Sequence, residues 1–146
     1  MLALDQKSRL TVPARYRDTL LQFCQGQLVI CKRPGGCLGM YPLPVWEKFQ
    51  AQLQGLPMEL DKWRAFFIGS AVDVEMDSAS RVLVPHELRA FAGLELVKGA
   101  DGKEAKDVKV MGVGSYFELW DNARYESGEA ELLAGPLPEA LRNLVV

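Results

Sequence analysis

The segment ALDQKSRLTVPARYRD, residues 3–18, returns later in the chain as EMDSASRVLVPHELRA, residues 75–90. At a constant offset of 72 positions, six residues recur: Asp5/Asp77, Ser8/Ser80, Arg9/Arg81, Val12/Val84, Pro13/Pro85 and Arg17/Arg89. A second match joins CLGMYPLPVWE, 37–47, to YFELWDNARYE, 116–126, at an offset of 79, so the second copy holds seven more residues. A repeat of this kind predicts a fold made from two similar units.

Each copy predicts the same order of elements. A short strand leads into a polar turn, DQKS or DSAS, and a second strand follows, RLTV or RVLV. The proline after it suits the first turn of a short helix, because its missing N–H is not needed there. Two more strands and a closing helix complete the unit, and the extra residues fall in or near KGADGKEAKD, 98–107, which predicts a loop tip. Because a unit of about 45 residues has too little core to stand alone, we expect the two units to share one core.

Apolar stripes at helical spacing predict further helices in the linker, 56–72, and in the tail, 135–146. We expect these stripes to pack in the core, with a subunit contact as the alternative. They consist of Leu60, Trp63 and Phe67 in the linker and of Leu137, Leu141, Leu144 and Val145 in the tail. Gly93 is expected to end the second short helix, and Asp121 to cap the helix that closes the second unit. The expected division is a first half-domain at 1–46, linker helices at 47–73, a second half-domain at 74–123 and a helical tail at 124–146.

The composition predicts a folded protein that does not enter membranes. Of the 146 residues 49% are hydrophobic, which is enough for a packed interior. No apolar run approaches the roughly 18–20 residues of a membrane span, and the N-terminus lacks the apolar core of a signal peptide. We therefore expect a cytoplasmic location. Cys24, Cys31 and Cys37 are too few and too widely spaced for a disulfide framework or a zinc site, and we interpret them as free thiols.

The sequence holds no pattern typical of catalysis. His86 is the one histidine of the chain, and the nucleophile, phosphate-loop and metalloprotease motifs are absent. Acidic pairs such as Glu129 and Glu131 are more simply a solvated face. We expect no enzymatic activity, no cofactor, no metal and no small-molecule substrate.

Basic residues gather at the start of the chain. Residues 1–33 hold six basic and two acidic residues, a net charge of +4, whereas the remainder sums to −6. Local charge, rather than the total, sets the attraction to a polyanion within a Debye length. The repeats differ in the same sense, because Lys7 and Arg15 match Ala79 and Glu87 in the second copy. If one copy contacts DNA, the first copy is the better candidate.

The D-x-x-x-R element, Asp5 to Arg9 and Asp77 to Arg81, leaves two interpretations open. An Asp–Arg pair can fix the turn. Lysine would serve a surface ion pair about equally well, whereas arginine offers a planar fork that binds a phosphate or a guanine edge through two hydrogen bonds. The sequence does not decide between a structural and a DNA-contacting arginine.

At these residues the chain resembles the MraZ family of bacterial transcriptional regulators. The resemblance rests on LALDQKSRLTVPARYRD, FFIGSAVDVEMDSASRVLVPHELRAFAGL and FELWD, and it runs from Leu2 to about Glu126. It implies an α+β fold of two AbrB-like swapped-hairpin β half-domains that share one core and have flanking helices. It also implies a ring-shaped homo-oligomer, an octamer or a similar ring. Such a ring would bind double-stranded DNA at direct repeats in the promoter of the cell-division and cell-wall gene cluster, which usually includes the regulator's own gene.

We therefore expect a sequence-specific DNA-binding regulator, associated with the nucleoid and acting as a repressor. The residues expected to contact DNA are Lys7, Arg9, Arg15 and Arg17. The motif residues expected to stabilise the turns are Asp5, Asp77 and Arg81. The alternative is an oligomeric antitoxin-like or scaffold protein whose basic patch binds an acidic protein partner.

Overall fold

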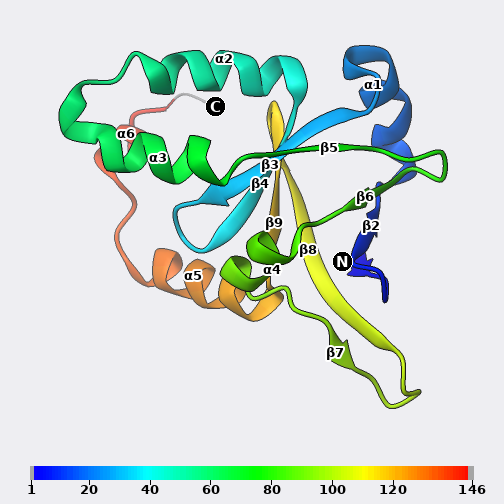
Figure 1. Ribbon diagram of the computed structural model, residues 1–146. Coiled ribbons are helices and arrows are strands. Elements are labelled where there is room, and N and C mark those ends of the chain that lie inside the picture. Colours follow the sequence, from blue (N-terminus) through cyan, green and yellow to red (C-terminus); the bar gives the residue numbers. More distant parts are fainter. Residues whose placement is uncertain (1, 145–146) are drawn as a thin grey trace.

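The computed structural model describes residues 2–144 and has the expected α+β architecture (Figure 1). An antiparallel sheet forms its centre, and helices lie around the sheet. The strands are β1 Leu2–Leu4, β2 Arg9–Thr11, β3 Gln27–Arg33, β4 Cys37–Pro42, β5 Val72–Glu75, β6 Arg81–Leu83, β7 Val97–Lys98, β8 Glu104–Val113 and β9 Tyr116–Trp120. The helices are α1 Ala14–Cys24, α2 Leu43–Gln54, α3 Asp61–Ser70, α4 His86–Ala92, α5 Asn122–Ala134 and α6 Glu139–Arg142, with the short 3-10 helix η1 at Met58–Leu60.

The sheet exchanges strands between the two repeats. Its strands follow the path β5-β3-β4-β9-β8-β1-β2-β6, and β7 pairs with β8 beside it. The path begins with β5 and ends with β6, which are consecutive in the chain, so the sheet is nearly closed. Strand β1 of the first repeat pairs with β8 of the second, and β5 of the second pairs with β3 of the first. This exchange confirms the predicted swapped-hairpin halves.

Strands β2 and β6 meet around a local twofold axis. Their register pairs Leu10 with Val82, Arg9 with Leu83 and Thr11 with Arg81. Since the repeat offset is 72, the register maps onto itself when the two copies are exchanged. Leu10 and Val82, at the centre of the pair, are 1% and 0% exposed. The repeated strand therefore builds the middle of the shared core.

One apolar core joins both repeats, as expected for units too small to fold alone. Its buried members include Leu4, Leu10, Val12, Leu20, Leu28, Ile30, Val82, Val84, Leu88, Leu94, Val108 and Leu119. A smaller cluster around Val29, Cys31, Tyr41 and Trp46 packs against α2 and α3. All three cysteines are buried free thiols, and burial raises the pKa of Cys31 and Cys37 to about 12.

Local chemistry sets the helix ends. Helix α1 begins directly after Pro13 and α4 directly after Pro85, so each proline is the N-cap residue rather than part of the first turn, where the sequence predicted it. Gly93 ends α4 with a φ of 70°, the left-handed conformation that glycine adopts without strain. Asp121 caps α5 by accepting a hydrogen bond from the amide of Arg124 at 3.1 Å. Between residues 2 and 144, no helix combines the length and the apolar character needed to cross a membrane.

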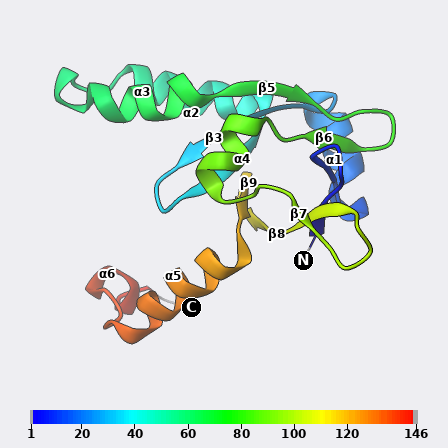
Figure 2. The same ribbon diagram turned by 60° about the horizontal axis from the view of Figure 1, so that its bottom comes forward.

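The apolar stripes of the linker and tail pack less than expected. The linker does form a helix, α3, and Phe67 packs inward, but Trp63 and Leu60 are exposed. For the described tail, the prediction of a core role is wrong, because Leu137, Leu141 and Leu144 are exposed; Val145 lies outside the described residues. The physical reason is that α5 and α6 bury no residue and lead away from the sheet (Figure 2).

The segment 98–107 is only partly the predicted loop tip. Strand β8 already begins at Glu104, and residues 106–108 pair with β1. The tip itself is a tight turn in which the amide of Gly99 donates to the carbonyl of Lys103 at 2.8 Å. The expected boundaries after residues 46 and 123 fall inside α2 and α5, and the division into half-domains remains a prediction.

Candidate nucleic-acid interface

The turn between β1 and β2 is held by the side chain of Asp5. Its Oδ1 accepts hydrogen bonds from the amides of Lys7 at 2.8 Å and Arg9 at 3.0 Å, and its Oδ2 accepts from Arg9 Nε at 3.1 Å. Ser8 adopts a φ of 63° to close the turn. Desolvation acts to raise the pKa of Asp5, but the bonds from Arg9 and Lys7 outweigh it and lower that pKa below its ordinary value of 3.8. The turn therefore holds an ionised Asp5 and a fixed Arg9.

The second copy repeats this bonding pattern. Asp77 accepts from the amides of Ala79 at 2.9 Å and Arg81 at 2.8 Å, and from Arg81 Nε at 3.0 Å. The amide of Arg81 is the main cause that lowers the pKa of Asp77. Ser80 has a φ of 61°, like its counterpart in the first turn. In both turns, then, the Asp–Arg pair has the structural role that the sequence left open. Of each guanidinium group, only Nε takes part in it.

Arg9 and Arg81 lie on the same outer face of the β2–β6 pair. Strand residues alternate between faces, and the central Leu10 and Val82 point into the core, so their neighbours point outward. Arg9 lies opposite Leu83, two residues from Arg81, and such diagonal positions are about 7–8 Å apart. Within residues 2–144, the terminal nitrogens of both guanidinium groups have no hydrogen-bond partner. The pair thus offers two oriented forks to a ligand outside the protein.

The sequence analysis did not predict that Arg81 lies close to Arg9. The sequence assigned Arg81 to its own turn, and the strand pairing places it beside the first copy. The signal was present in the repeat itself: matching strands of two repeats that share a core can pair symmetrically, and symmetric pairing brings matching residues together.

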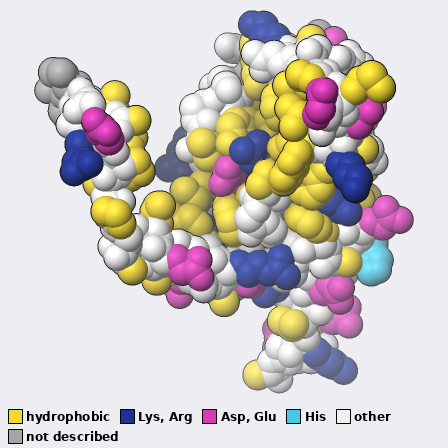
Figure 3. All heavy atoms as spheres, turned by 90° about the vertical axis from the view of Figure 1, so that its left-hand side faces the viewer, with side chains coloured by type: hydrophobic (Ala, Val, Ile, Leu, Met, Phe, Trp, Pro, Cys, Tyr) yellow, Lys and Arg dark blue, Asp and Glu magenta, His cyan; other side chains and the backbone are white. Residues whose placement is uncertain are grey.

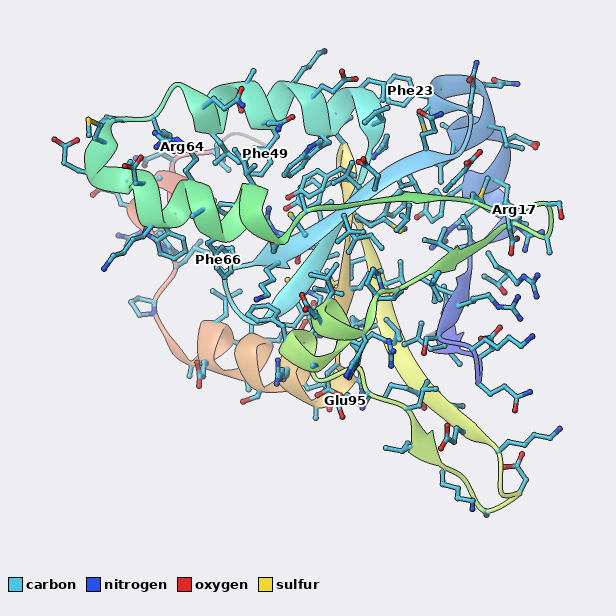
Figure 4. The ribbon with its side chains drawn as sticks, viewed as in Figure 1. Arg17, Phe23, Phe49, Arg64, Phe66 and Glu95 are labelled. Atoms are coloured by element: carbon cyan, nitrogen blue, oxygen red, sulfur yellow. The ribbon has the colours of Figure 1, made fainter. Side chains whose placement is uncertain are left out.

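The other predicted contacts divide into two kinds. Lys7 and Arg15 are exposed, and the Arg15 guanidinium lies 4.8 Å from the centre of the Tyr16 ring. Arg17 is partly buried and donates from Nε to the carbonyl of Val12 at 2.7 Å. Figure 4 shows Arg17 on α1, on the same side of the molecule as β2 and β6. Arg17 therefore ties strand to helix, and only its terminal nitrogens are available to a phosphate.

The hairpin of β7 and β8 flanks the first turn. A cleft of about 470 Å³ lies between them, lined on one side by Asp5 and Gln6 and on the other by residues including Lys103 and Lys106. Lys106 Nζ donates to Asp121 at 2.7 Å, so it is held, whereas Lys103 is exposed near the tip. The sequence indicated only a tolerant loop here; pairing with β1 gives the hairpin its place beside Asp5.

Comparison with known proteins agrees with this architecture. The family model described as "MraZ protein, putative antitoxin-like" matches the chain twice, over residues 1–66 and 67–145. The chain belongs to the MraZ family. The double match corresponds to the two repeats that exchange strands in the sheet.

Curated relatives cover nearly the whole chain. "Transcriptional regulator MraZ" of Methylibium petroleiphilum is 49% identical over 96% of this chain and 89% of the relative. The proteins of the same name from Leptothrix cholodnii and Burkholderia cenocepacia are 46% and 45% identical, each over 97% of this chain and over 90% and 93% of their own lengths. These names describe regulators of transcription rather than enzymes, and the chain is accordingly a transcription regulator and not an enzyme.

Proposed function

We propose that this MraZ protein is a sequence-specific DNA-binding regulator that reads double-stranded DNA with the outer face of its β2–β6 pair. The observation that carries the proposal is the position of Arg9 and Arg81, each held through Nε by an aspartate and each with terminal nitrogens free of protein partners within residues 2–144. A two-stranded antiparallel ribbon fits the major groove, and arginine is the commonest reader of guanine there.

Neighbouring side chains would add two further kinds of DNA contact, to thymine methyl groups and to phosphates. Thr11 and Leu83 are exposed between and beside the arginines, and apolar or methyl groups at such positions can contact the methyl group of thymine. Lys7, Arg15 and the terminal nitrogens of Arg17 would bind phosphates and so fix the position of the ribbon on the duplex. The first copy would contribute more of these contacts, because Ala79 and Glu87 replace two of its basic residues in the second.

The regulatory part of the proposal follows from the family. The protein would act as a repressor of the cell-division and cell-wall gene cluster and of its own promoter, in the cytoplasm and on the nucleoid. It would bind direct repeats as a ring-shaped homo-oligomer. Head-to-tail contacts between unlike surfaces suit such a ring, since they close when the rotation between subunits permits.

A mobility-shift titration on the DNA upstream of its own gene tests the proposal. A specific complex should survive competition by shuffled DNA, and its affinity should fall steeply with salt, because each phosphate contact adds about 0.9 to the slope of log affinity against log salt. Lys7→Ala should reduce that slope, whereas Lys48→Ala removes the same charge from an exposed position of α2 and should not. Equal affinity for promoter and shuffled DNA would contradict sequence-specific binding.

The second candidate function is an antitoxin-like protein that binds an acidic protein partner, because the family description includes the word antitoxin-like. In that case the basic turn would contact an acidic protein, and the affinity for DNA would be weak and independent of sequence. The same titration separates the two functions, since only a DNA reader prefers the promoter after the salt-dependent, sequence-independent part is removed.

A further inference from the structure

The C-terminal arm, residues 122–144, carries an apolar surface that nothing in the described chain covers. Helices α5 and α6 bury no residue. The five exposed leucines of the arm are Leu132, Leu133, Leu137, Leu141 and Leu144. Figure 3 shows the arm standing away from the body, with apolar side chains along it. Contiguous exposed apolar residues of this kind mark interaction sites.

A second uncovered apolar surface lies on the body of the same chain. This Trp63 groove is a cleft of about 510 Å³ lined by residues that include Gly35, Gly36, Lys62, Trp63, Phe66 and Phe91. Trp63 is 50% exposed. Phe66 packs edge to face on both Trp63 and Phe91, at 5.7 and 5.9 Å between ring centres, and extends from α3 as Figure 4 shows. The groove is thus a preformed aromatic site.

The start of α5 is anchored at the rim of its own groove. Nη1 of Arg124 donates to the carbonyls of Gly36 at 3.1 Å and Phe91 at 3.0 Å, and both residues line the groove. An α-helix rises 1.5 Å per residue, so α5 carries Leu132 about 15 Å away from Asn122. Among the described residues, no hydrogen bond or ion pair joins 126–144 back to the body. The arm leaves its own groove open.

The arm and the groove are both apolar, and their charges are complementary. Residues 126–144 of the arm hold four glutamates and one basic residue, Arg142. The groove has Lys62 in its lining, and Lys32 lies 5.0 Å over the ring of Phe91. Neither lysine forms an ion pair within residues 2–144. An acidic apolar arm therefore fits a groove with a basic rim, and both belong to one chain.

We propose that the arm of one copy of this chain lies in the Trp63 groove of a second copy. The contact is heterologous, because arm and groove are different surfaces, and it repeats from copy to copy until the ring closes. The inference rests on the homo-oligomer of the proposed function and assigns its subunit contact. It makes Trp63 the anchor of that contact, in agreement with the frequency of tryptophan among residues that dominate interfaces.

Two variants, measured separately and mixed, test this assignment by sedimentation velocity. The arm variant is Leu132→Glu combined with Leu133→Glu, and the groove variant is Trp63→Glu. The wild type should form a ring, and each variant alone should be a monomer, because its dissociation constant for assembly rises at least about 30-fold, as for the loss of an interface anchor. An equimolar mixture should form a dimer and nothing larger, because it retains one intact arm and one intact groove. Val97→Glu, at an equally exposed apolar position on β7, should assemble like the wild type.

A second groove variant guards against simple misfolding. Lys62→Glu changes only an exposed side chain and should weaken assembly less than Trp63→Glu, while the circular dichroism spectrum stays that of the wild type. Rings of unchanged size in the arm and groove variants would overturn the assignment and leave the proposed DNA function intact. A mixture that stays monomeric, or a wild type that is itself a monomer, would also overturn it. DNA binding is judged apart from assembly, since a monomeric variant should still shift a single-repeat probe.

Discussion

Arg9 and Arg81 are diagonal neighbours across the antiparallel β2–β6 pair, each bound through Nε to the aspartate four residues before it. The strand pairing fixes the distance between the two side chains, and the aspartates fix their direction. Two guanidinium groups held in this way lose little conformational freedom when they bind, which favours affinity. The two differ in their surroundings, because Lys7 and Arg15 accompany only Arg9.

This difference leads to the first prediction. Arg9→Ala should abolish specific DNA binding in a fluorescence-anisotropy titration, and Arg81→Ala should weaken it less. A base-contacting arginine contributes roughly 1–3 kcal/mol per site, and the loss multiplies when several subunits bind together. Thermal unfolding serves as the control, because both variants should remain folded. Equal losses for the two would show that the copies read DNA alike.

The second prediction concerns the support of Arg9. Asp5→Asn keeps the Oδ1 acceptor for the two amides and loses only the pair with Arg9, so it should retain much of the DNA affinity. Asp5→Ala loses all three bonds and should lower the free energy of unfolding by about 1 kcal/mol, after allowance for its partly exposed side chain. Asp77→Ala is the matched control and should affect stability more than DNA binding. Tighter binding by Asp5→Ala than by wild type would instead identify Asp5 as a repulsive charge.

Acid should destabilise the protein through three aspartates. Bonds from the protein lower the pKa of Asp5, Asp77 and Asp121 in the folded state, the last chiefly through Lys106 Nζ. Their stabilising effect is therefore present above the ordinary pKa of 3.8 and is lost as the pH falls through the lower folded values. The free energy of unfolding, measured in urea, should be level near neutral pH and fall below about pH 4. The double variant Asp5→Asn, Asp77→Asn should show a shallower fall, and an unchanged slope would contradict the assignment.

The order of elements was predictable because its causes are local. Asp5 and Asp77 satisfy nearby amides, and Pro13 and Pro85 start helices, so each repeated segment carries the instructions for its own turn, strand and helix. The place of Arg81 was not predictable from such signals. Its approach to Arg9 depends on pairing between strands 72 residues apart, and periodicity within a strand does not name the partner strand.

The tail also shows that a local pattern does not name the partner of an element. The spacing of Leu137, Leu141 and Leu144 predicts a helix with one apolar face, but the helix that forms, α6, is four residues long and contains only Leu141. The spacing also does not say whether these exposed leucines meet the core or another molecule. Arg17 is a further case: its recurrence at position 89 is equally consistent with a phosphate contact and with the bond to the strand carbonyl that both copies make.

A pair of glycine substitutions tests the packing of the smaller cluster. A Cβ on Gly39 would lie 2.6 Å from Tyr41 Cε1 and 2.9 Å from Arg33 Cδ. The Tyr41 ring is fixed between Phe49 and Tyr116, so it has no room to yield. Gly39→Ala should lower the free energy of unfolding by about 1–3 kcal/mol. Gly69→Ala, in helix α3 with open space around it, should raise the free energy of unfolding by about 0.5–1 kcal/mol, and the reverse order in urea titrations would refute this account.

The last prediction links the ribbon to the operator. One β2–β6 pair has few contacts, so a single subunit should bind DNA weakly, and neighbouring subunits of a ring should add affinity through effective concentration. Subunits in a head-to-tail ring present their ribbons in one direction, so the operator should carry direct repeats rather than a palindrome. The repeats should be spaced about one helical turn, roughly 10 bp, so that each faces the same side of the duplex.

Affinity measured on probes with one, two and three repeats should rise at each step for the wild type. It should stay flat for the monomeric arm variant, whose ribbon is intact. A wild-type affinity that does not rise with repeat number, or that is kept when the second repeat is inverted, would rule out this arrangement.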